Sequence, residues 1–260
     1  MSLEPIKFED GVAYERMMGA WSQLVGSKFL NWMSPRKGQR WIDVGCGNGA
    51  FTEQIVRHCS PNEVQGIDPS EAQIVFASNR EGAQIAVFQT GDAMALPFAI
   101  DYFDAATMAL VIFFVPDPAL GVAEMKRVVR PGGSVAAYAW DVFGGGVPTA
   151  PITAELRASN ISYPLPPSVN ASRMEVLHGL WVDAGLQSVE TSVITVERTF
   201  ANFEELWSTN ALSPTLKPVL AKLPEKTISQ LQNAVRERFP ADAKGQITYS
   251  SHANAIKGLV

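Results

Sequence analysis

The chain has 260 residues, of which 47% are hydrophobic and 18% are charged, and its net charge is −5. These values predict one sizeable globular domain, or one domain with a cap. The acidic balance and the lack of a long basic run argue against a nucleic-acid partner. No apolar run reaches the ~18 residues of a membrane span and no signal-peptide pattern precedes the first elements, so we expect a cytoplasmic protein.

The chain contains two cysteines, Cys46 and Cys59, and neither has the spacing of a zinc site. Cys46 lies inside a glycine-rich stretch, where a structural disulfide is not expected. We therefore predict two small buried side chains and no metal site.

Residues 11–33 carry large apolar side chains at intervals of three and four, which predicts an amphipathic helix. Two interpretations remain open. The helix packs on a sheet, or it is a lid that presents Tyr14, Met18 and Trp21 to a substrate. For each residue taken alone, packing is the more common outcome.

Residues 40–50 read Arg-Trp-Ile-Asp-Val-Gly-Cys-Gly-Asn-Gly-Ala. They predict a buried strand, a glycine turn and the start of a helix, a combination that holds cofactors at the carboxyl end of a sheet. The three glycines allow close approach of the backbone, and free N–H groups of the helix that begins near Ala50 are expected to face the same space. A dinucleotide fingerprint would place its third glycine at position 50, where Ala50 stands.

Two acids follow the next two predicted strands. Asp68 ends the strand 64–68 and lies 19 residues after Gly49 (68 − 49), a position suited to accepting hydrogen bonds from ribose hydroxyls. Ser70 begins a capping box with Gln73 that starts a helix running to about residue 80. Asp92 follows the strand 85–89, where an acid can accept from an adenine amino group.

Further strands are expected at 103–110 and 134–140, separated by a helix after Pro118 and by the stop Arg130-Pro131-Gly132-Gly133. Strands that alternate with helices predict a doubly wound α/β sheet. Glycines and prolines then mark residues 144–171 as a long irregular insertion at the ligand-bearing end of the sheet. Helices at 172–184, 202–211, 214–223 and 225–239 and strands at 188–198 and 246–251 complete the pattern.

Several of these motifs appear together in one family. The strings Asp43-Val44-Gly45-Cys46-Gly47-Asn48-Gly49, Gly66-Ile67-Asp68-Pro69-Ser70 and Gly91-Asp92-Ala93-Met94-Ala95-Leu96-Pro97-Phe98 occur in the order typical of class I S-adenosylmethionine-dependent methyltransferases. Phe103-Asp104 and the run Glu124-x-x-Arg127-Val128-Val129-Arg130-Pro131-Gly132-Gly133 extend the match. The chain resembles the ubiquinone- and menaquinone-pathway methylases over roughly residues 35–140. The leader Tyr-x-x-Met-Met-Gly-x-Trp-Ser is a fainter similarity.

The resemblance implies a mostly parallel, seven-stranded Rossmann-like sheet with an antiparallel last strand pair and a helical or loop cap. It implies S-adenosylmethionine as cofactor, with Asp43 orienting the turn or the cofactor's amino group, Asp68 holding the ribose and the backbone near Met108 accepting from the ammonium group. The cofactor-binding residues implied are Asp43, Gly45, Cys46, Gly47, Gly49, Asp68, Pro69, Asp92, Ala93 and Met108.

Many relatives carry polar residues and a histidine pair after the fourth strand, whereas this chain has Phe113 and Phe114. That departure suggests an apolar pocket floor. The predicted substrate pocket comprises Tyr14, Met18, Trp21, Phe113 and Trp140. No catalytic residue is identifiable, and Asp141, beside Trp140, and His178 are the candidates for a base or anchor.

We predict transfer of a methyl group from S-adenosylmethionine to a small, fairly apolar molecule by in-line displacement. The alternatives are a non-catalytic binding protein of the same fold and a nicotinamide-dependent oxidoreductase. The expected domains are a helical lid at 1–34, a core at 35–143 and 172–260, and a cap insertion at 144–171. We expect a monomer or homodimer.

Overall fold

The computed structural model describes residues 18–260, so Tyr14 and residues 11–17 of the predicted 11–33 helix lie outside the described residues. The sheet has seven strands in the order β3-β2-β1-β4-β5-β7-β6. Its strands are β1 (Arg40–Val44), β2 (Glu63–Asp68), β3 (Ala86–Thr90), β4 (Phe103–Ala109), β5 (Val129–Trp140), β6 (Gln187–Phe200) and β7 (Ile247–Leu259). The first five are parallel, and β7 pairs antiparallel with both β5 and β6, which confirms the predicted fold class.

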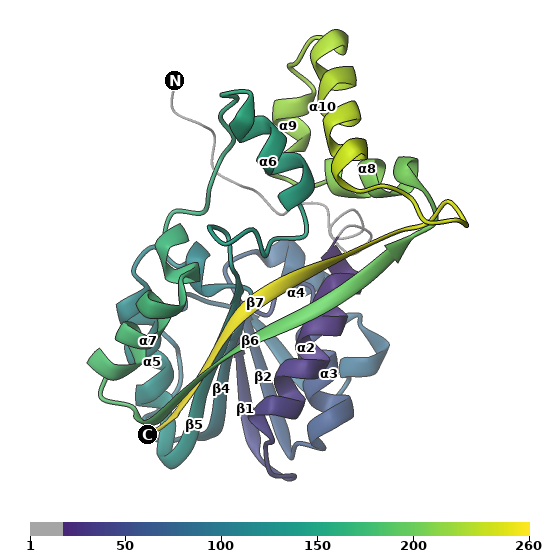
Figure 1. Ribbon diagram of the computed structural model, residues 1–260. Coiled ribbons are helices and arrows are strands. Elements are labelled where there is room, and N and C mark those ends of the chain that lie inside the picture. Colours follow the sequence, from purple (N-terminus) through teal and green to yellow (C-terminus); the bar gives the residue numbers. More distant parts are fainter. Residues whose placement is uncertain (1–17) are drawn as a thin grey trace.

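Helices cover both faces of this sheet (Figure 1). α2 (Ala20–Met33) and α3 (Ala50–Cys59) share a core with one face, and α5 (Pro118–Val128) and α7 (Met174–Asp183) share a core with the other. α4 (Glu71–Ser78) packs on β2 and β3. Trp41 and Ile42 in β1 are fully buried on opposite faces, as a central parallel strand requires.

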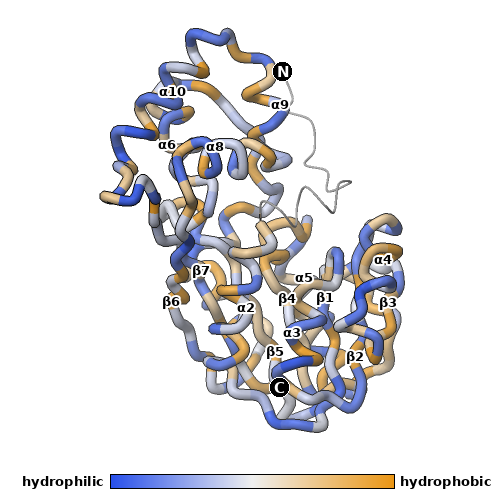
Figure 2. Tube along the Cα trace, turned by 90° about the vertical axis from the view of Figure 1, so that its right-hand side faces the viewer, coloured by the Kyte–Doolittle hydropathy of each residue, from blue (hydrophilic) through white to orange (hydrophobic). Residues whose placement is uncertain are grey.

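Four helices form a separate layer above the sheet: α6 (Ala150–Ala158), α8 (Phe203–Ala211), α9 (Lys217–Leu220) and α10 (Glu225–Arg238). Ile152 and Leu156 of α6 share a small hydrophobic core with Leu216 and with Leu231 of α10. In Figure 2 these helices carry hydrophilic as well as hydrophobic residues, as helices with one buried face do. α10 thus packs on the insertion through Leu231, while Phe203 and Leu206 of α8 and Val235 of α10 belong to the large core that α2 and α3 share with the sheet.

The insertion is more regular than its composition suggests. We expected residues 144–171 to be irregular, but Ala150–Ala158 is α-helical. Pro151 lies in the first turn of α6, where a proline costs no intrahelical hydrogen bond. Short 3₁₀ turns occur at η2 (Glu81–Ala83), η3 (Ile112–Phe114) and η4 (Val169–Ser172).

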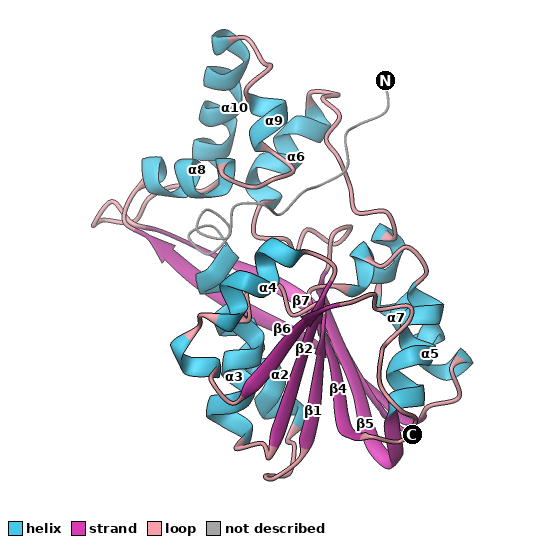
Figure 3. Cartoon of the chain, turned by 180° about the vertical axis from the view of Figure 1, so that it is seen from behind, coloured by secondary structure: helices cyan, strands magenta, loops and turns pink. Residues whose placement is uncertain are grey.

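Two strands differ from their predicted bounds. β5 begins at Val129, and the register with β4 shifts between Phe103 and Ala105, so the predicted stop at 130–133 is an irregularity within the strand pair. β7 is about twice as long as predicted, and its first residues pair with β6 beyond the end of β5. Figures 1 and 3 show β6 and β7 reaching past the sheet toward α8. Among the described helices, none has the length and apolar character that a bilayer crossing demands.

Candidate active site

The glycine turn between β1 and α3 is shaped by its own hydrogen bonds. The N–H groups of Gly45 and Cys46 both donate to the carbonyl of Ile67, at 2.7 and 2.9 Å. The N–H of Ala50 donates to the side-chain oxygen of Asn48 at 3.2 Å. Of the helix N–H groups that we expected to be free, that of Ala50 is therefore already bonded, and the N–H groups of Gly45 and Cys46 in the turn are bonded as well.

The three glycines of the turn have different surroundings. All have positive φ, at 75°, 51° and 78° for Gly45, Gly47 and Gly49. A Cβ on Gly45 would lie 2.4 Å from Val111, and one on Gly49 would lie 3.1 Å from Ala77, whereas one on Gly47 would meet no atom within 4 Å. Gly47 is thus the position at which the turn faces open space.

Asp68, at the end of β2, is fixed beside this turn. One oxygen of its carboxylate accepts from the N–H of Gly47 at 3.0 Å, and the other accepts from the N–H of Ser70 at 2.9 Å. Burial raises the pKa of Asp68, and the two N–H donors act in the opposite direction. Because each oxygen has a second lone pair, the carboxylate can also accept from hydroxyl groups of a ligand.

Asp92 lies next to Asp68. The N–H of Gly91 donates to the backbone carbonyl of Asp68 at 3.1 Å, which places the exposed Asp92 beside the end of β2. Asp92 accepts from the N–H of Met94 at 2.8 Å and so begins a tight turn. The sequence-predicted residues Pro69 and Ala93 follow these two acids directly in the chain.

A charged pair holds the loop that carries Asp92. Glu124 of α5 accepts from the N–H of Leu96 at 2.8 Å, and Arg127 donates to the carbonyls of Leu96 and Phe98, each at 2.8 Å. Glu124 and Arg127 also bond each other at 2.6 Å. This contact explains why the strings at 91–98 and 124–127 occur together in one motif set.

Asp43 and Met108 are deeper than the turn itself. Asp43 is fully buried and accepts from the hydroxyl of Thr52 at 2.6 Å, so it ties β1 to α3 beneath the glycines. Burial raises its pKa to about 7. The side chain of Met108 is buried toward Gly121 of α5, which leaves only its backbone for a ligand.

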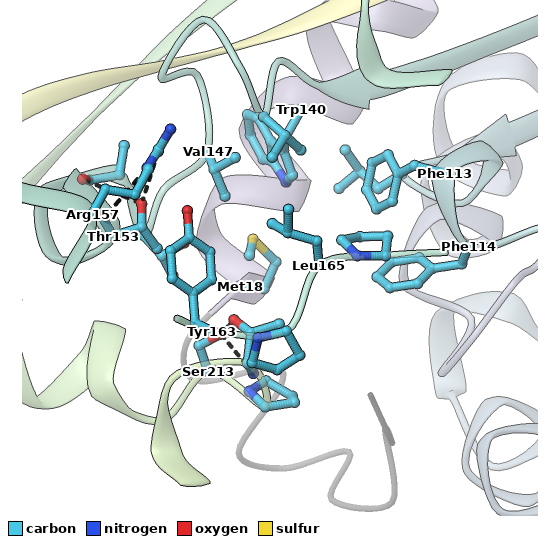
Figure 4. A pocket seen from close by; sticks show the side chains of 18 residues that line it. Met18, Phe113, Phe114, Trp140, Val147, Thr153, Arg157, Tyr163, Leu165 and Ser213 are labelled. Atoms are coloured by element: carbon cyan, nitrogen blue, oxygen red, sulfur yellow. Dashed lines mark hydrogen bonds between the residues drawn. The ribbon is translucent and has the colours of Figure 1, made fainter. Parts of the chain in front are cut away.

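An apolar cavity, here called the cap pocket, lies between the sheet and the cap, which from here on means residues 144–171 together with residues 203–238. It encloses about 100 Å³, and its lining comes from the ends of β4 and β5 (Leu110, Phe113 and Trp140), from Met18, and from the cap. Leu110 precedes Val111, the residue that packs on Gly45, so one short segment borders both the cap pocket and the glycine turn. Figure 4 shows Phe113 and Phe114 on one side of the cap pocket and Arg157 on the other.

Three sequence-predicted residues lie outside this pocket. Trp21 is fully buried against Phe200 and Tyr249, so it packs in the core and does not line the cap pocket. Asp141 turns to the N–H of Gly144 at 2.7 Å and to His252 at 3.4 Å. His178 is exposed on α7 and does not line the pocket.

Sequence reasoning missed the polar residues that the cap contributes, notably Thr153, Arg157, Tyr163 and Ser213. They come from two segments, residues 153–163 and the region of residue 213, which are 50 residues apart and which no local pattern connects. Spacing on α6 was the one available signal, because Thr153 and Arg157 are four residues apart and share a face.

Comparison with known proteins gives a consistent result. Residues 42–137 match the family described as methyltransferase domain. The chain is 35% identical over 108 residues to the ubiquinone/menaquinone biosynthesis C-methyltransferase of Roseobacter denitrificans, covering 40% of this chain and 43% of that protein. It is 33% identical over 136 residues to a demethylmenaquinone methyltransferase of Staphylococcus aureus, covering 52% and 54%. The chain thus spans about half the length of these curated relatives.

Among solved structures, phosphoethanolamine N-methyltransferase 2 of Haemonchus contortus in complex with S-adenosyl-L-methionine superposes with a TM-score of 0.59. The identity is 19%, and the match covers 95% of this chain and 56% of that chain. This likeness concerns the fold alone. The family match thus identifies a methyltransferase domain at residues 42–137, and this part of the chain is similar in sequence to the ubiquinone and menaquinone methylases.

Proposed function

We propose that the protein transfers a methyl group from S-adenosylmethionine to a small, largely apolar molecule held in the cap pocket. The observation that carries the proposal is the shared border between the glycine turn and the cap pocket at Leu110 and Val111. A donor held at the turn and an acceptor held under the cap would then meet at this border.

The residues present fit the cofactor. Gly47 faces open space that a side chain would fill, and Asp68 is held beside it with acceptor capacity to spare. Asp92 lies in the adjacent turn. When bound, S-adenosylmethionine supplies an activated methyl group on a sulfonium centre, and the protein's task is alignment and exclusion of water.

The cap pocket provides no evident base. Among its described lining residues there is no Asp, Glu, His, Lys or Cys. Asp141 and His178, the two candidates, point elsewhere, so the proposal assigns no proton transfer to them. The acceptor is then a molecule that is nucleophilic without help from an enzyme base, such as an ionised oxygen or an activated carbon.

Isothermal titration calorimetry with S-adenosylmethionine, S-adenosylhomocysteine and NAD tests the cofactor. We expect both sulfur compounds to bind and NAD not to bind. Asp68→Ala is expected to weaken S-adenosylmethionine binding by about 1–3 kcal/mol through loss of charge-assisted hydrogen bonds. Transfer of a labelled methyl group to members of a metabolite panel distinguishes the enzyme from a non-catalytic binder. The proposal would be refuted if neither S-adenosylmethionine nor S-adenosylhomocysteine bound to the protein.

Two glycine variants sharpen this test. Gly47→Ala adds a methyl group to open space, so we expect a stability cost of only about 1–2 kcal/mol for the positive φ but a loss of cofactor affinity of about tenfold. Gly45→Ala would collide with Val111 and should unfold the protein more readily. Unchanged cofactor affinity in a folded Gly47→Ala variant would place the cofactor elsewhere.

A further inference from the structure

The lining of the cap pocket contains a buried hydrogen-bond donor that bonds to none of residues 18–260. Trp140, at the end of β5, is 3% exposed and lines the cap pocket, and its indole Nε1 has no hydrogen-bond partner among the described residues. In Figure 4 the nitrogen end of the ring is directed toward the space between Met18 and Leu165. A buried N–H without an acceptor is costly, so a ligand oxygen at this point would relieve that cost.

The opposite side of the cap pocket carries a positive charge. Arg157 of α6 is the only charged residue among the described residues that line it. Its guanidinium bonds only Thr153 of its own helix, at 3.3 and 3.5 Å, and makes no ion pair with any described carboxylate. The nearby Glu155 is paired with Arg238 at 3.0 Å. The charge of Arg157 is therefore available to a ligand.

Apolar side chains of the pocket lining separate Trp140 Nε1 from the guanidinium of Arg157. In Figure 4 Val147 lies between Arg157 and Trp140, and the hydroxyl of Tyr163 points toward Val147. Leu165 and Phe113 lie beside Trp140. Trp140 lies at the carboxyl end of β5, at the end of the parallel strands where the glycine turn also lies, whereas Arg157 belongs to the cap. A ligand that satisfies both groups must span the cap pocket with its oxygen acceptor inward and its charge outward.

We propose that the methyl acceptor is an organic anion with an apolar body, an oxygen that accepts from Trp140 Nε1, and a carboxylate at the far end that pairs with Arg157. The proposal rests on the proposed function and names the substrate class of the same site. The oxygen held by Trp140 lies at the end nearest the glycine turn, where the methyl donor would be held.

Three probe molecules separate the two contacts: 4-hydroxycinnamate, cinnamate without the phenol oxygen, and the uncharged amide of 4-hydroxycinnamate. Calorimetry is performed on the full chain with and without S-adenosylhomocysteine. For the wild type we expect removal of either group to weaken binding about fivefold. In Trp140→Phe, binding should no longer depend on the phenol oxygen but should still depend on the carboxylate. In Arg157→Gln, binding should still depend on the phenol oxygen but should no longer depend on the carboxylate.

Lys222→Gln is the matched control, because it removes an exposed positive charge from the same cap at a residue that does not line the cap pocket. It should keep both preferences of the wild type. Equal affinity of the wild type for all three probes, including no binding by any of them at millimolar concentration, overturns the proposal even if Trp140→Phe fails to fold. Binding of S-adenosylhomocysteine in the same experiment distinguishes that outcome from failure of the proposed function.

Discussion

The buried Asp43 makes a direct prediction about stability and pH. Desolvation by burial, opposed by the hydrogen bond from Thr52, raises the pKa of Asp43 from 3.8 to about 7. Between these two values the folded protein holds a proton that the unfolded chain has released. The free energy of unfolding of the wild type should therefore fall as pH rises through this window, and level off above about pH 7.

Asp43→Asn removes the titration while keeping an oxygen that can accept from Thr52 at 2.6 Å. The difference between 3.8 and about 7, at about 1.4 kcal/mol for each pH unit, corresponds to about 4 kcal/mol. As the pH rises from 4 to 8, the free energy of unfolding of the variant should increase by this amount relative to that of the wild type. At pH 8 the Asn variant is expected to be the more stable protein.

Urea unfolding, followed by tryptophan fluorescence at intervals from pH 4 to pH 8, measures the two stability curves. Asp101→Asn is the control, because Asp101 is exposed and its positive φ of 60° suits asparagine. The control should run parallel to the wild type. If the curve of Asp43→Asn also runs parallel to the wild type, Asp43 is ionised in the folded protein without penalty, and the reasoning from burial is wrong.

Three further results are expected. Trp21→Ala should lower the free energy of unfolding by about 3–5 kcal/mol in denaturation experiments because it empties a fully buried site. If a folded Trp21→Phe variant no longer bound 4-hydroxycinnamate, that result would instead support the lid role. Arg127→Met should cost about 2 kcal/mol and weaken S-adenosylmethionine binding through the loop of Asp92. Because the hydrogen bond from Arg127 holds the pKa of Glu124 below 4.5, the advantage of wild type over Glu124→Gln should persist at neutral pH and vanish on acidification below that value.

The sheet could be predicted up to Trp140 because local signals mark each boundary. Ser70 caps α4 by accepting from the N–H of Gln73, and Asp117 caps α5 by accepting from the N–H of Leu120 with Pro118 following. These signals depend on residues within one helical turn, so they are legible without tertiary structure.

The cap could not be predicted because its assembly depends on distant contacts. Its core joins α6 to α10, about 75 residues later, and the hydroxyl of Tyr249 in β7 donates to the carbonyl of Pro148 at 2.7 Å. Prolines in the insertion suggested an irregular loop, although Pro151 suits the first turn of a helix. The same limit hid Arg157 and Tyr163 as pocket residues.

Trp21 and β7 show two other limits of local reading. A three- and four-residue spacing identifies the buried face of a helix but not what covers it, so lid and core looked alike for Trp21. The second half of β7 contains Ala253, Ala255 and Gly258, which have weak strand preference. They form a strand because β5 and β6 lie on either side of β7 and supply its hydrogen bonds.

The apolar lining of the cap pocket and an anionic acceptor favour the same chemistry. Attack of an anionic oxygen on a sulfonium centre cancels two opposite charges, so the transition state carries less separated charge than the reactants. A site with few polar groups stabilises the reactants' charges poorly and therefore lowers the barrier to a reaction that removes them. The N–H of Trp140 would orient the acceptor oxygen, and the absence of Asp, Glu, His, Lys and Cys among the described lining residues costs nothing if that oxygen is ionised on arrival. The rate should then depend on pH through the acidity of the acceptor itself, so two acceptors of different pKa should give profiles with different midpoints, whereas one midpoint for both would reveal a base in the protein.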